Sequence, residues 1–225
     1  MLRKPFHNVH YLKTKYTVDR VKKEINAGLE LLGGIREPIV SFFGSHKTKS
    51  SSPYYKQTKE VAYMLGKCGY AIVTGGGPGI MKAANEGATK AKAPSIGIKA
   101  SLIKGEKNND LVFTNQLSYH FLFVRRFILS IKSDALIFLP GGYGTLNELF
   151  EYIVLMQLDF IDQVPIILVG KDYWKGLFKW LEEQPGRKDY FIKQDRDLGL
   201  LEFCDTTEEI VGLVEKRCAY KKPKK

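Results

Sequence analysis

Two glycine-rich segments of the chain have the composition of anion-binding turns. Residues 75–79 read Gly-Gly-Gly-Pro-Gly between an apolar run and a helical pattern, and residues 141–145 read Gly-Gly-Tyr-Gly-Thr in the same setting. Glycine lets backbone N–H groups approach an anion closely, and a helix N-terminus adds partial positive charge, so such turns favour a phosphate group. Neither segment matches the P-loop of ATP hydrolases or the fingerprint of dinucleotide-binding sites.

A carboxylate, Glu148, follows the second turn and has two interpretations. Thr145 and Glu148 have the spacing of a capping box, in which the carboxylate only accepts a hydrogen bond from the backbone at the start of a helix. Alternatively, Glu148 faces a sugar bound on the glycine turn, where a carboxylate can bind hydroxyl groups or stabilise a centre that resembles an oxocarbenium ion. The sequence leaves both interpretations open.

Two consecutive arginines and a shorter glycine turn are further candidates for contacts with a ligand. Arg125 and Arg126 lie in the otherwise apolar segment 121–129. Burying unpaired guanidinium groups is costly, so we expect them to reach solvent, a carboxylate or an anionic ligand. Gly44 and Ser45 follow another apolar run, where a glycine turn is either a tight connection or part of a ligand site.

The elements that must position these residues form a repeating pattern. Apolar runs at residues 39–43, 70–74, 95–98, 135–139 and 165–169 alternate with helical segments, which predicts a parallel sheet with crossover helices. We therefore predict a single α/β domain, a Rossmann-like doubly wound sheet over residues 35–218. A basic segment and a packed helix, residues 1–34, precede it, and a basic tail, residues 219–225, follows it. Ligands bind at the carboxyl edge of such sheets, where all three turns lie.

Helix patterns add finer expectations. Asp172 is expected to cap a helix over 173–183, and Thr206 with Glu209 forms a capping box ahead of residues 210–217. In the helix that follows the second turn, an apolar stripe is expected to face the core, and a second face is expected to point elsewhere. The stripe consists of Leu146, Leu149, Phe150, Ile153 and Val154, and the second face consists of Glu148, Glu151, Tyr152 and Leu155.

The net charge of +11 invites a nucleic-acid interpretation, but its distribution argues against one. Residues 1–25 hold seven basic and two acidic side chains, residues 216–225 hold six and none, and the rest of the chain holds 22 of each. Within that neutral body, residues 26–132 are basic and residues 133–215 are acidic. Nucleic-acid binding through the basic ends therefore remains a secondary alternative.

Neither a membrane segment nor a metal site is indicated. The longest apolar runs are far shorter than a membrane helix, and the first residues lack the apolar centre of a signal peptide. Three cysteines form neither a disulfide framework nor a zinc pattern, and His7 and His10 have no evident third ligand. We expect a cytoplasmic protein with no membrane partner.

Four segments together resemble the Lonely Guy (LOG) family of nucleoside-monophosphate phosphoribohydrolases, in its longer bacterial branch. They are residues 75–81, the pair Arg125 and Arg126, the triplet Ser-Asp-Ala at 133–135, and Pro-Gly-Gly-Tyr-Gly-Thr-Leu-Asn-Glu at 140–148. The resemblance implies a Rossmann-like fold, a homodimer or larger homo-oligomer, no metal or other cofactor, and hydrolysis of a nucleotide N-glycosidic bond. Such sequences have also been described as lysine decarboxylases, but no lysine is placed as an evident Schiff-base partner for pyridoxal phosphate.

The resemblance also assigns roles by position. The family's catalytic arginine and glutamate fall on Arg125 and Glu148. Residues expected to bind substrate or its phosphate are Gly44, Ser45, Gly75, Gly76, Gly77, Gly79, Met81, Glu106, Asn109, Arg126, Gly141, Gly142, Tyr143, Gly144 and Thr145. Arg126 and Asn147 depart from the residues usual in the family, which leaves the base unspecified.

The leading hypothesis is hydrolysis of a purine nucleoside 5′-monophosphate, of the AMP or cytokinin riboside type, to free base and ribose 5-phosphate. The alternative is a Rossmann-like carrier that binds a nucleotide or cofactor without turnover.

Overall fold

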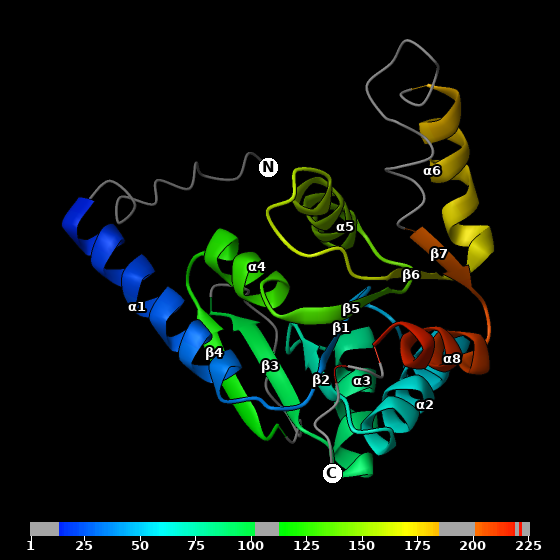
Figure 1. Ribbon diagram of the computed structural model, residues 1–225, viewed down its shortest axis with the longest axis horizontal. Helices are drawn as coiled ribbons and strands as arrows, with labels where there is room; N and C mark the ends of the chain where they lie inside the picture. Colours follow the sequence, from blue (N-terminus) through cyan, green and yellow to red (C-terminus); the bar gives the residue numbers. More distant parts are fainter. Residues whose placement is uncertain (1–13, 102–112, 185–200, 219–220, 222–225) are drawn as a thin grey trace, which may run out of the picture.

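The protein forms one seven-stranded parallel sheet covered by helices on both faces (Figure 1). The computed structural model describes residues 14–101, 113–184, 201–218 and 221. The strands are β1 (Ile39–Phe43), β2 (Ala71–Thr74), β3 (Ser95–Ala100), β4 (Asn115–Tyr119), β5 (Ser133–Phe138), β6 (Ile166–Val169) and β7 (Leu201–Cys204). Their order is β4-β3-β2-β1-β5-β6-β7, and every pairing is parallel. This confirms the predicted Rossmann-like α/β fold.

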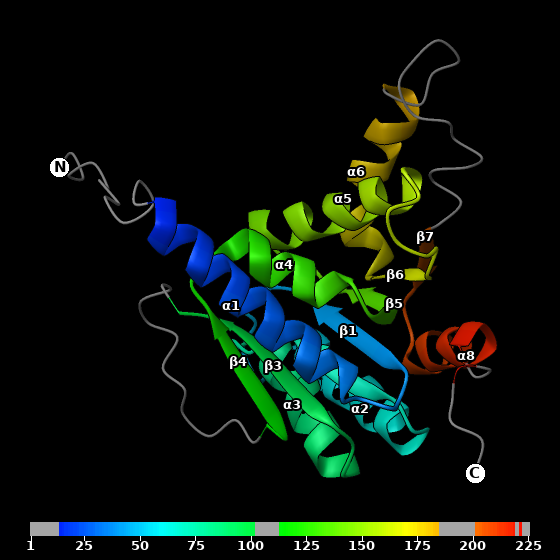
Figure 2. The same cartoon turned by 60° about the vertical axis from the view of Figure 1, so that its left-hand side comes forward.

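The helices form two layers with separate apolar cores (Figure 2). They are α1 (Thr14–Gly33), α2 (Pro53–Lys67), α3 (Ile80–Ala91), α4 (Leu122–Ser130), α5 (Tyr143–Gln157), α6 (Lys171–Glu183) and α8 (Thr207–Cys218). One core packs α1, α4, α5 and α6 against the sheet, and the other packs α2, α3 and α8 against its opposite face. Among the described residues, no helix has the combined length and apolar character that a bilayer span requires.

The five predicted strands are present, and the two strands without an apolar run lie at the edges of the sheet. β4 has the sequence Asn-Gln-Leu-Ser-Tyr, and most of its side chains are exposed because only β3 flanks it. β7 spans four residues and pairs only with β6. An edge strand is covered on fewer sides than a central one, so its sequence need not be continuously apolar. Hydrophobicity therefore did not reveal either strand.

The capping predictions had opposite outcomes. The capping box ahead of α8 is confirmed, since the Glu209 N–H donates to the Thr206 hydroxyl and the Thr206 N–H donates to the Glu209 carboxylate, both at 3.2 Å. The prediction for α6 was wrong. This helix begins at Lys171 after Gly170, whose positive φ of 90° ends the connection from β6, and Asp172 pairs with Lys175 inside the first turn.

The face of α5 that packs against the core differs from the predicted one by a rotation about the helix axis. The residues of α5 that are buried are Thr145, Leu149, Tyr152 and Met156. Tyr152, expected on the other face, is 2% exposed and packs its ring near Phe43, whereas Val154 is 45% exposed. The helix packs on the sheet through the face that also carries Glu148, and this brings Glu148 toward the sheet edge.

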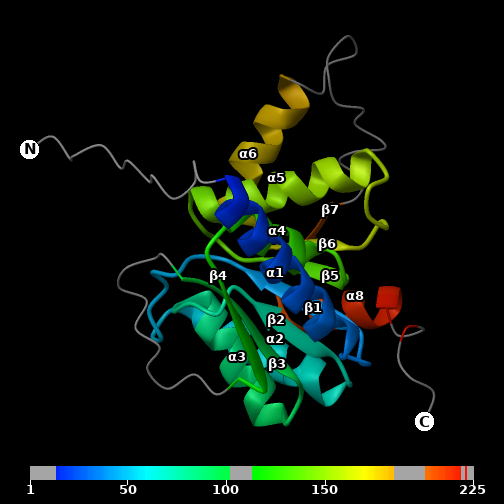
Figure 3. The same cartoon turned by 90° about the vertical axis from the view of Figure 1, so that its left-hand side faces the viewer.

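α1 is joined to the start of α4 by a buried carboxylate. Glu24 is 8% exposed, and its two oxygens accept hydrogen bonds from the N–H groups of His120 and Phe121 at 2.8 and 3.2 Å. Arg20 pairs with the same carboxylate at 3.0 Å. A carboxylate near a helix N-terminus is favourable, so this contact stabilises the helix that carries Arg125. Figure 3 shows α1 alongside α4 on the same side of the sheet.

Candidate active site

A pocket of about 390 Å³ opens at the carboxyl edge of the sheet, where β1 lies between β2 and β5. Strands β2, β3 and β4 follow one another on one side of β1, and β5, β6 and β7 follow one another on its other side. The pocket therefore lies at the topological switch point of the sheet, where open α/β sheets bind ligands. The residues that line the pocket are Phe42, Phe43, Gly44, Ser45, His46, Lys47, Gly75, Met81, Arg125, Gly142, Tyr143, Gly144, Thr145 and Glu148.

The turn after β1 is held by its neighbours on both sides. The Ser45 N–H donates to the Pro140 carbonyl at 3.1 Å, and the Ser45 carbonyl accepts the Ile80 N–H at 3.1 Å. Gly44 has no room for a larger side chain, because a Cβ there would lie 2.8 Å from the Ile80 side chain. The turn is therefore a fixed wall of the pocket and also a connection between strand and helix.

The glycine turn after β2 is supported by a buried polar network. The Thr74 hydroxyl donates to the Asn85 side-chain oxygen at 2.5 Å and accepts the Gly76 N–H at 3.0 Å, while Asn85 donates to the Ser95 hydroxyl at 2.9 Å. Gly76 has a positive φ of 68°, which favours glycine. The network therefore holds the turn in one conformation.

Gly79 serves close packing in that turn. It also has a φ of 68°, and a Cβ there would lie 2.3 Å from the Ser45 carbonyl oxygen. The N–H of Ile80, at the start of α3, donates to that same carbonyl. One of the N–H groups that we expected to meet a phosphate is thus used inside the protein.

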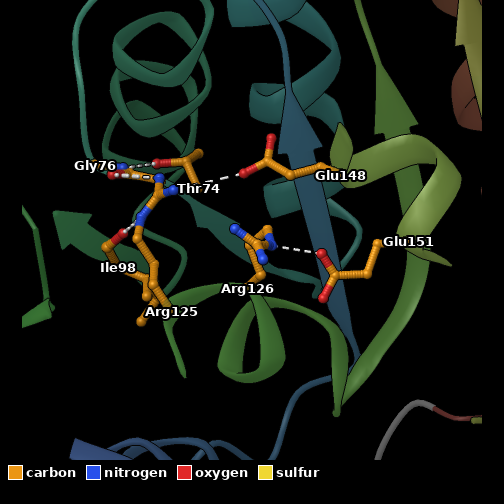
Figure 4. A network of polar contacts seen from close by, with 8 residues as sticks. Thr74, Gly76, Ile98, Arg125, Arg126, Glu148 and Glu151 are labelled. Carbon is orange, nitrogen blue, oxygen red and sulfur yellow. Dashed lines mark hydrogen bonds and ion pairs between the residues drawn. The ribbon is translucent and has the colours of Figure 1, made fainter. Parts of the chain in front are cut away.

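Arg125 projects from α4 into the pocket and is fixed by backbone oxygens (Figure 4). Its Nε donates to the Ile98 carbonyl at 2.7 Å, and its Nη2 donates to the Gly75 carbonyl at 3.3 Å. A Cβ on Gly75 would lie 2.0 Å from Nη2, so the glycine allows the guanidinium to approach. Two carbonyl contacts leave Nη1 directed toward α5, where it meets Glu148.

Glu148 lies opposite Arg125 and does not cap its helix. α5 begins at Tyr143 with Gly142 as the N-cap residue, so Glu148 is in the second turn, too far along to reach the cap. Its Oε1 lies 3.5 Å from Nη1 of Arg125, and the two side chains are 14% and 13% exposed. Burial raises the pKa of Glu148 to about 7, although Arg125 and, more weakly, Arg126 act to lower it. A carboxyl group with this pKa changes its charge near neutral pH.

The N-terminus of α5 supplies backbone donors beside these two side chains. The Leu146 N–H donates to the Gly142 carbonyl at 3.0 Å, which is the first bond of the helix ladder. The N–H groups of Tyr143, Gly144 and Thr145 precede it and have no carbonyl one turn back within the helix. No side chain of the described residues caps this end. Such a helix start is suited to an anion.

The structure brings together ten of the residues predicted from the sequence and leaves others away from the pocket. Those at the pocket are Gly44, Ser45, Gly75, Met81, Gly142, Tyr143, Gly144 and Thr145, besides Arg125 and Glu148, while Gly76, Gly77, Gly79 and Gly141 do not line it. Arg126 is also not at the wall, because it forms a hydrogen-bonded ion pair with Glu151. Glu106 and Asn109 lie outside the described residues.

Four pocket residues were not singled out as ligand contacts. Phe42 and Phe43 end β1, and His46 and Lys47 follow its glycine turn, so position after the first strand is the signal that could have revealed them. Lys47 is exposed and lies on the same pocket as the start of α5. In the described part of the chain, no group of three His, Cys, Asp or Glu side chains is placed to hold a metal ion.

Comparison of the sequence with known proteins finds one matching family and several related enzymes. Residues 81–214 match the family described as "Possible lysine decarboxylase". A probable cytokinin riboside 5′-monophosphate phosphoribohydrolase of Oryza sativa subsp. japonica is 28% identical over 171 residues, which cover 73% of this chain and 74% of the relative. A cytokinin riboside 5′-monophosphate phosphoribohydrolase of Arabidopsis thaliana is 29% identical over 147 residues, 64% of this chain and 67% of the relative.

Solved structures share the fold at lower sequence identity. The molybdenum cofactor binding protein of Rippkaea orientalis superimposes with a TM-score of 0.58 at 20% identity, over 81% of this chain and 98% of that one. The Moco carrier protein of Chlamydomonas reinhardtii gives 0.57 at 19% identity, over 82% and 99%. The family match spans more than half of the sequence and includes Arg125 and the turn that leads to Glu148. The chain therefore belongs to the family described as "Possible lysine decarboxylase", which is the Lonely Guy (LOG) family.

Proposed function

We propose that this protein hydrolyses the N-glycosidic bond of a purine nucleoside 5′-monophosphate, of the AMP or cytokinin riboside type, and releases the free base and ribose 5-phosphate. The observation that carries the proposal is the placement of Glu148 and Arg125 within one pocket beside the uncapped N-terminus of α5. The family relatives with phosphoribohydrolase names support the same reaction class.

The 5′-phosphate would bind at the start of α5, on the N–H groups of Tyr143, Gly144 and Thr145. Helix N-termini bind phosphate through free N–H groups and the positive end of the helix dipole. Lys47 supplies a cation from the opposite loop. The phosphate would thereby hold the ribose between the turn after β1 and the side chain of Glu148.

Glu148 would act on the ribose, and Arg125 would act through charge and position. As the C1′–N bond breaks, its electron pair goes to the base and positive charge develops at C1′, which an ionised carboxylate stabilises. The oxygen of a water molecule then bonds to C1′ and one of its protons passes to Glu148 or to solvent, while the departing base takes up one proton from solvent, so that the sum of the reaction is hydrolysis. A guanidinium stays protonated at neutral pH, so Arg125 orients Glu148 and the departing base and does not donate a proton.

The charge division of the chain supports a small anionic substrate. The basic portion, residues 26–132, contributes β1 and Arg125, and the acidic portion, residues 133–215, contributes α5 and Glu148. The pocket lies where the two portions meet. A phosphate beside a sugar hydroxyl group needs a cationic side and an acceptor side, and this junction offers both.

Product analysis tests the proposal directly. The purified protein is incubated with AMP, with N6-isopentenyl AMP and with adenosine, and free base and ribose 5-phosphate are quantified by chromatography. We expect base release from at least one monophosphate and none from adenosine, and we expect Glu148→Gln to abolish the reaction. Absence of base release across a full panel of nucleoside monophosphates would overturn the proposal.

A second candidate is a carrier that binds a phosphorylated cofactor without turnover. The pocket at the switch point, with Arg125 and an uncapped helix start, would suit such a ligand equally well. The two superimposed structures named for binding or carrying molybdenum cofactor share this fold. Calorimetry that detects tight binding of a nucleotide or pterin phosphate, without any product over hours, would favour the carrier.

We also propose that the protein is a cytoplasmic homodimer or larger homo-oligomer that assembles through α4 and α5. Phe123 and Phe127 on α4 are 53% and 39% exposed, and Val154 on α5 and Leu158 at its C-cap are 45% and 58% exposed. α4 and α5 lie side by side, joined by ion pairs, so these side chains belong to neighbouring helices. Exposed apolar side chains gathered on one region are typical of a protein interface.

A further inference from the structure

Two consecutive arginines of α4 pair with two carboxylates that are one turn apart on α5. Arg125 lies 3.5 Å from Glu148, whereas Arg126 forms a hydrogen-bonded ion pair with Glu151 (Figure 4). The first pair lines the pocket and the second does not. The side chains of Arg126 and Glu151 are 27% and 31% exposed, so the second pair is more accessible to solvent than the first.

The second pair lies next to Glu148, because Glu151 follows Glu148 by three residues on α5, the spacing of neighbouring side chains on one helix face, and Arg126 is paired with Glu151. Arg126 favours the ionised form of that carboxyl and Glu151 opposes it. Arg126 and Glu151 are paired with each other, and their effects on Glu148 have opposite signs, so each offsets part of the other. Removing either member would leave the other unbalanced, and the two removals would act on Glu148 in opposite directions.

We propose that Arg126 and Glu151 form a charge-tuning pair in which each residue offsets the other's effect on the proton affinity of the Glu148 carboxyl, so that the pair keeps the site active in one pH range. Both are positioning residues, since neither lines the pocket. The role in activity rests on the proposed function, but the effect on Glu148 does not. This inference replaces the expectation that Arg126 binds the phosphate of the substrate.

The other titratable or charged groups around Glu148 lie on α4, on α5 and in the loop after β1. On α4, Arg125 lowers the pKa of Glu148, and its position is fixed by the carbonyl groups of Ile98 and Gly75. On α5, burial raises the pKa of Tyr152 well above its ordinary value, so that phenol stays uncharged near neutral pH. Across the pocket, His46 and Lys47 come from the exposed loop after β1. None of these groups is itself replaced in the variants at positions 126 and 151.

A set of four variants separates charge tuning from simple bracing of two helices. They are Arg126→Gln, Glu151→Gln, the double variant, and Glu86→Gln, which breaks the Lys59–Glu86 pair between α2 and α3 as a matched control. The titration of Glu148 is followed by NMR on protein labelled with ¹³C at the glutamate carboxyl carbon, with Glu148→Gln used to assign the signal. The pH profile of kcat/KM for the best nucleoside monophosphate is measured in parallel.

We expect opposite shifts from the two single variants. Glu151→Gln should lower the apparent pKa of Glu148, and Arg126→Gln should raise it, each by roughly half a pH unit or more. The double variant should return it close to the wild-type value, and Glu86→Gln should not move it. The acidic limb of the activity profile should follow the NMR titration in each case.

Two outcomes would overturn the inference. If both single variants leave the Glu148 titration in place, or shift it in the same direction, the pair does not tune it. If the double variant is as far from wild type as either single variant, the pair acts only as a brace between α4 and α5. Opposite NMR shifts in a protein that hydrolyses no nucleotide would support the tuning and would contradict the proposed function instead.

Discussion

Arg125 reaches Glu148 with one guanidinium nitrogen, while its other two nitrogens each donate to a backbone carbonyl, of Ile98 and of Gly75. The 3.5 Å separation from Oε1 is longer than a usual charge-assisted hydrogen bond. The arginine is therefore held by the fold and not by the carboxylate. This leaves the Glu148 carboxylate available to a ligand.

Glu148→Gln should stabilise the protein at alkaline pH. Because the folded-state pKa of Glu148 is raised from 4.5 to about 7, ionisation opposes folding, and this cost builds up between those two pH values and stays constant above them. The variant cannot ionise, so its gain in unfolding free energy should be up to roughly 3 kcal/mol larger at pH 8 than at pH 4.5. Urea denaturation at both pH values checks this. Equal gains at the two pH values would show that Glu148 titrates normally.

Lys47→Ala should weaken binding of the phosphate group. Lys47 lines the pocket opposite the N-terminus of α5, and an exposed cation near a phosphate contributes about 1 kcal/mol. Calorimetry with ribose 5-phosphate should show roughly a five-fold loss of affinity, largest at low salt. Lys49→Ala is the matched control, since Lys49 is exposed in the same loop and does not line the pocket. Equal losses in both variants would indicate only a general charge effect.

Gly75→Ala should displace Arg125 without unfolding the protein. The added Cβ would lie 2.0 Å from Nη2 of Arg125 and 2.8 Å from the Met81 sulfur, and these are side-chain atoms that can move. We expect nucleotide hydrolysis to fall by about 100-fold or more, as for loss of one preorganised electrostatic group. Gly176→Ala on α6 is the control, because no described residue beyond the backbone of this helix has an atom within 4 Å of an added Cβ, and it should stabilise the helix by about 0.5–1 kcal/mol. Full activity in Gly75→Ala would argue against a precise role for Arg125.

Asn85→Ala should destabilise the fold and loosen the turn after β2. The substitution removes the acceptor of the Thr74 hydroxyl and one donor to the Ser95 hydroxyl, and each buried partner that is lost costs about 1–3 kcal/mol. Denaturation should show a loss of roughly 2–4 kcal/mol. Asn147→Ala, at an exposed position of α5, should change stability by less than about 0.5 kcal/mol. A loss below that of the control would mean that water replaces the missing amide.

Phe123→Glu combined with Phe127→Glu should convert the proposed homodimer to a monomer. These side chains are exposed on α4, and a charge at the centre of an apolar interface is costly to bury. Light scattering coupled to size exclusion measures the mass directly. Trp180→Glu on α6, which is 55% exposed, is the control and should leave the mass unchanged. A wild-type protein that is already monomeric would contradict the proposed assembly.

The sequence by itself determined the class of fold and the location of the site. Continuous apolar runs such as residues 135–139, separated by glycine turns and helical patterns, are typical of strands in a parallel sheet covered on both faces. Parallel strands bring their carboxyl ends to one edge, so the glycine turns after β1, β2 and β5 had to meet there. The edge strands β4 and β7 escaped prediction because their few contacts require no apolar run.

Only the tertiary structure decided which of two possible roles Glu148 takes and which of two adjacent arginines enters the pocket. The spacing of Thr145 and Glu148 fits a helix cap and a pocket carboxylate equally well, and the start of α5 at Tyr143 selected the second. Arg125 and Arg126 are adjacent in sequence, yet successive residues on a helix point about 100° apart, so one enters the pocket and the other meets Glu151. The spacing of two residues in the sequence fixes only the angle between their side chains on the helix. Packing of α4 and α5 on the sheet fixes them relative to the site.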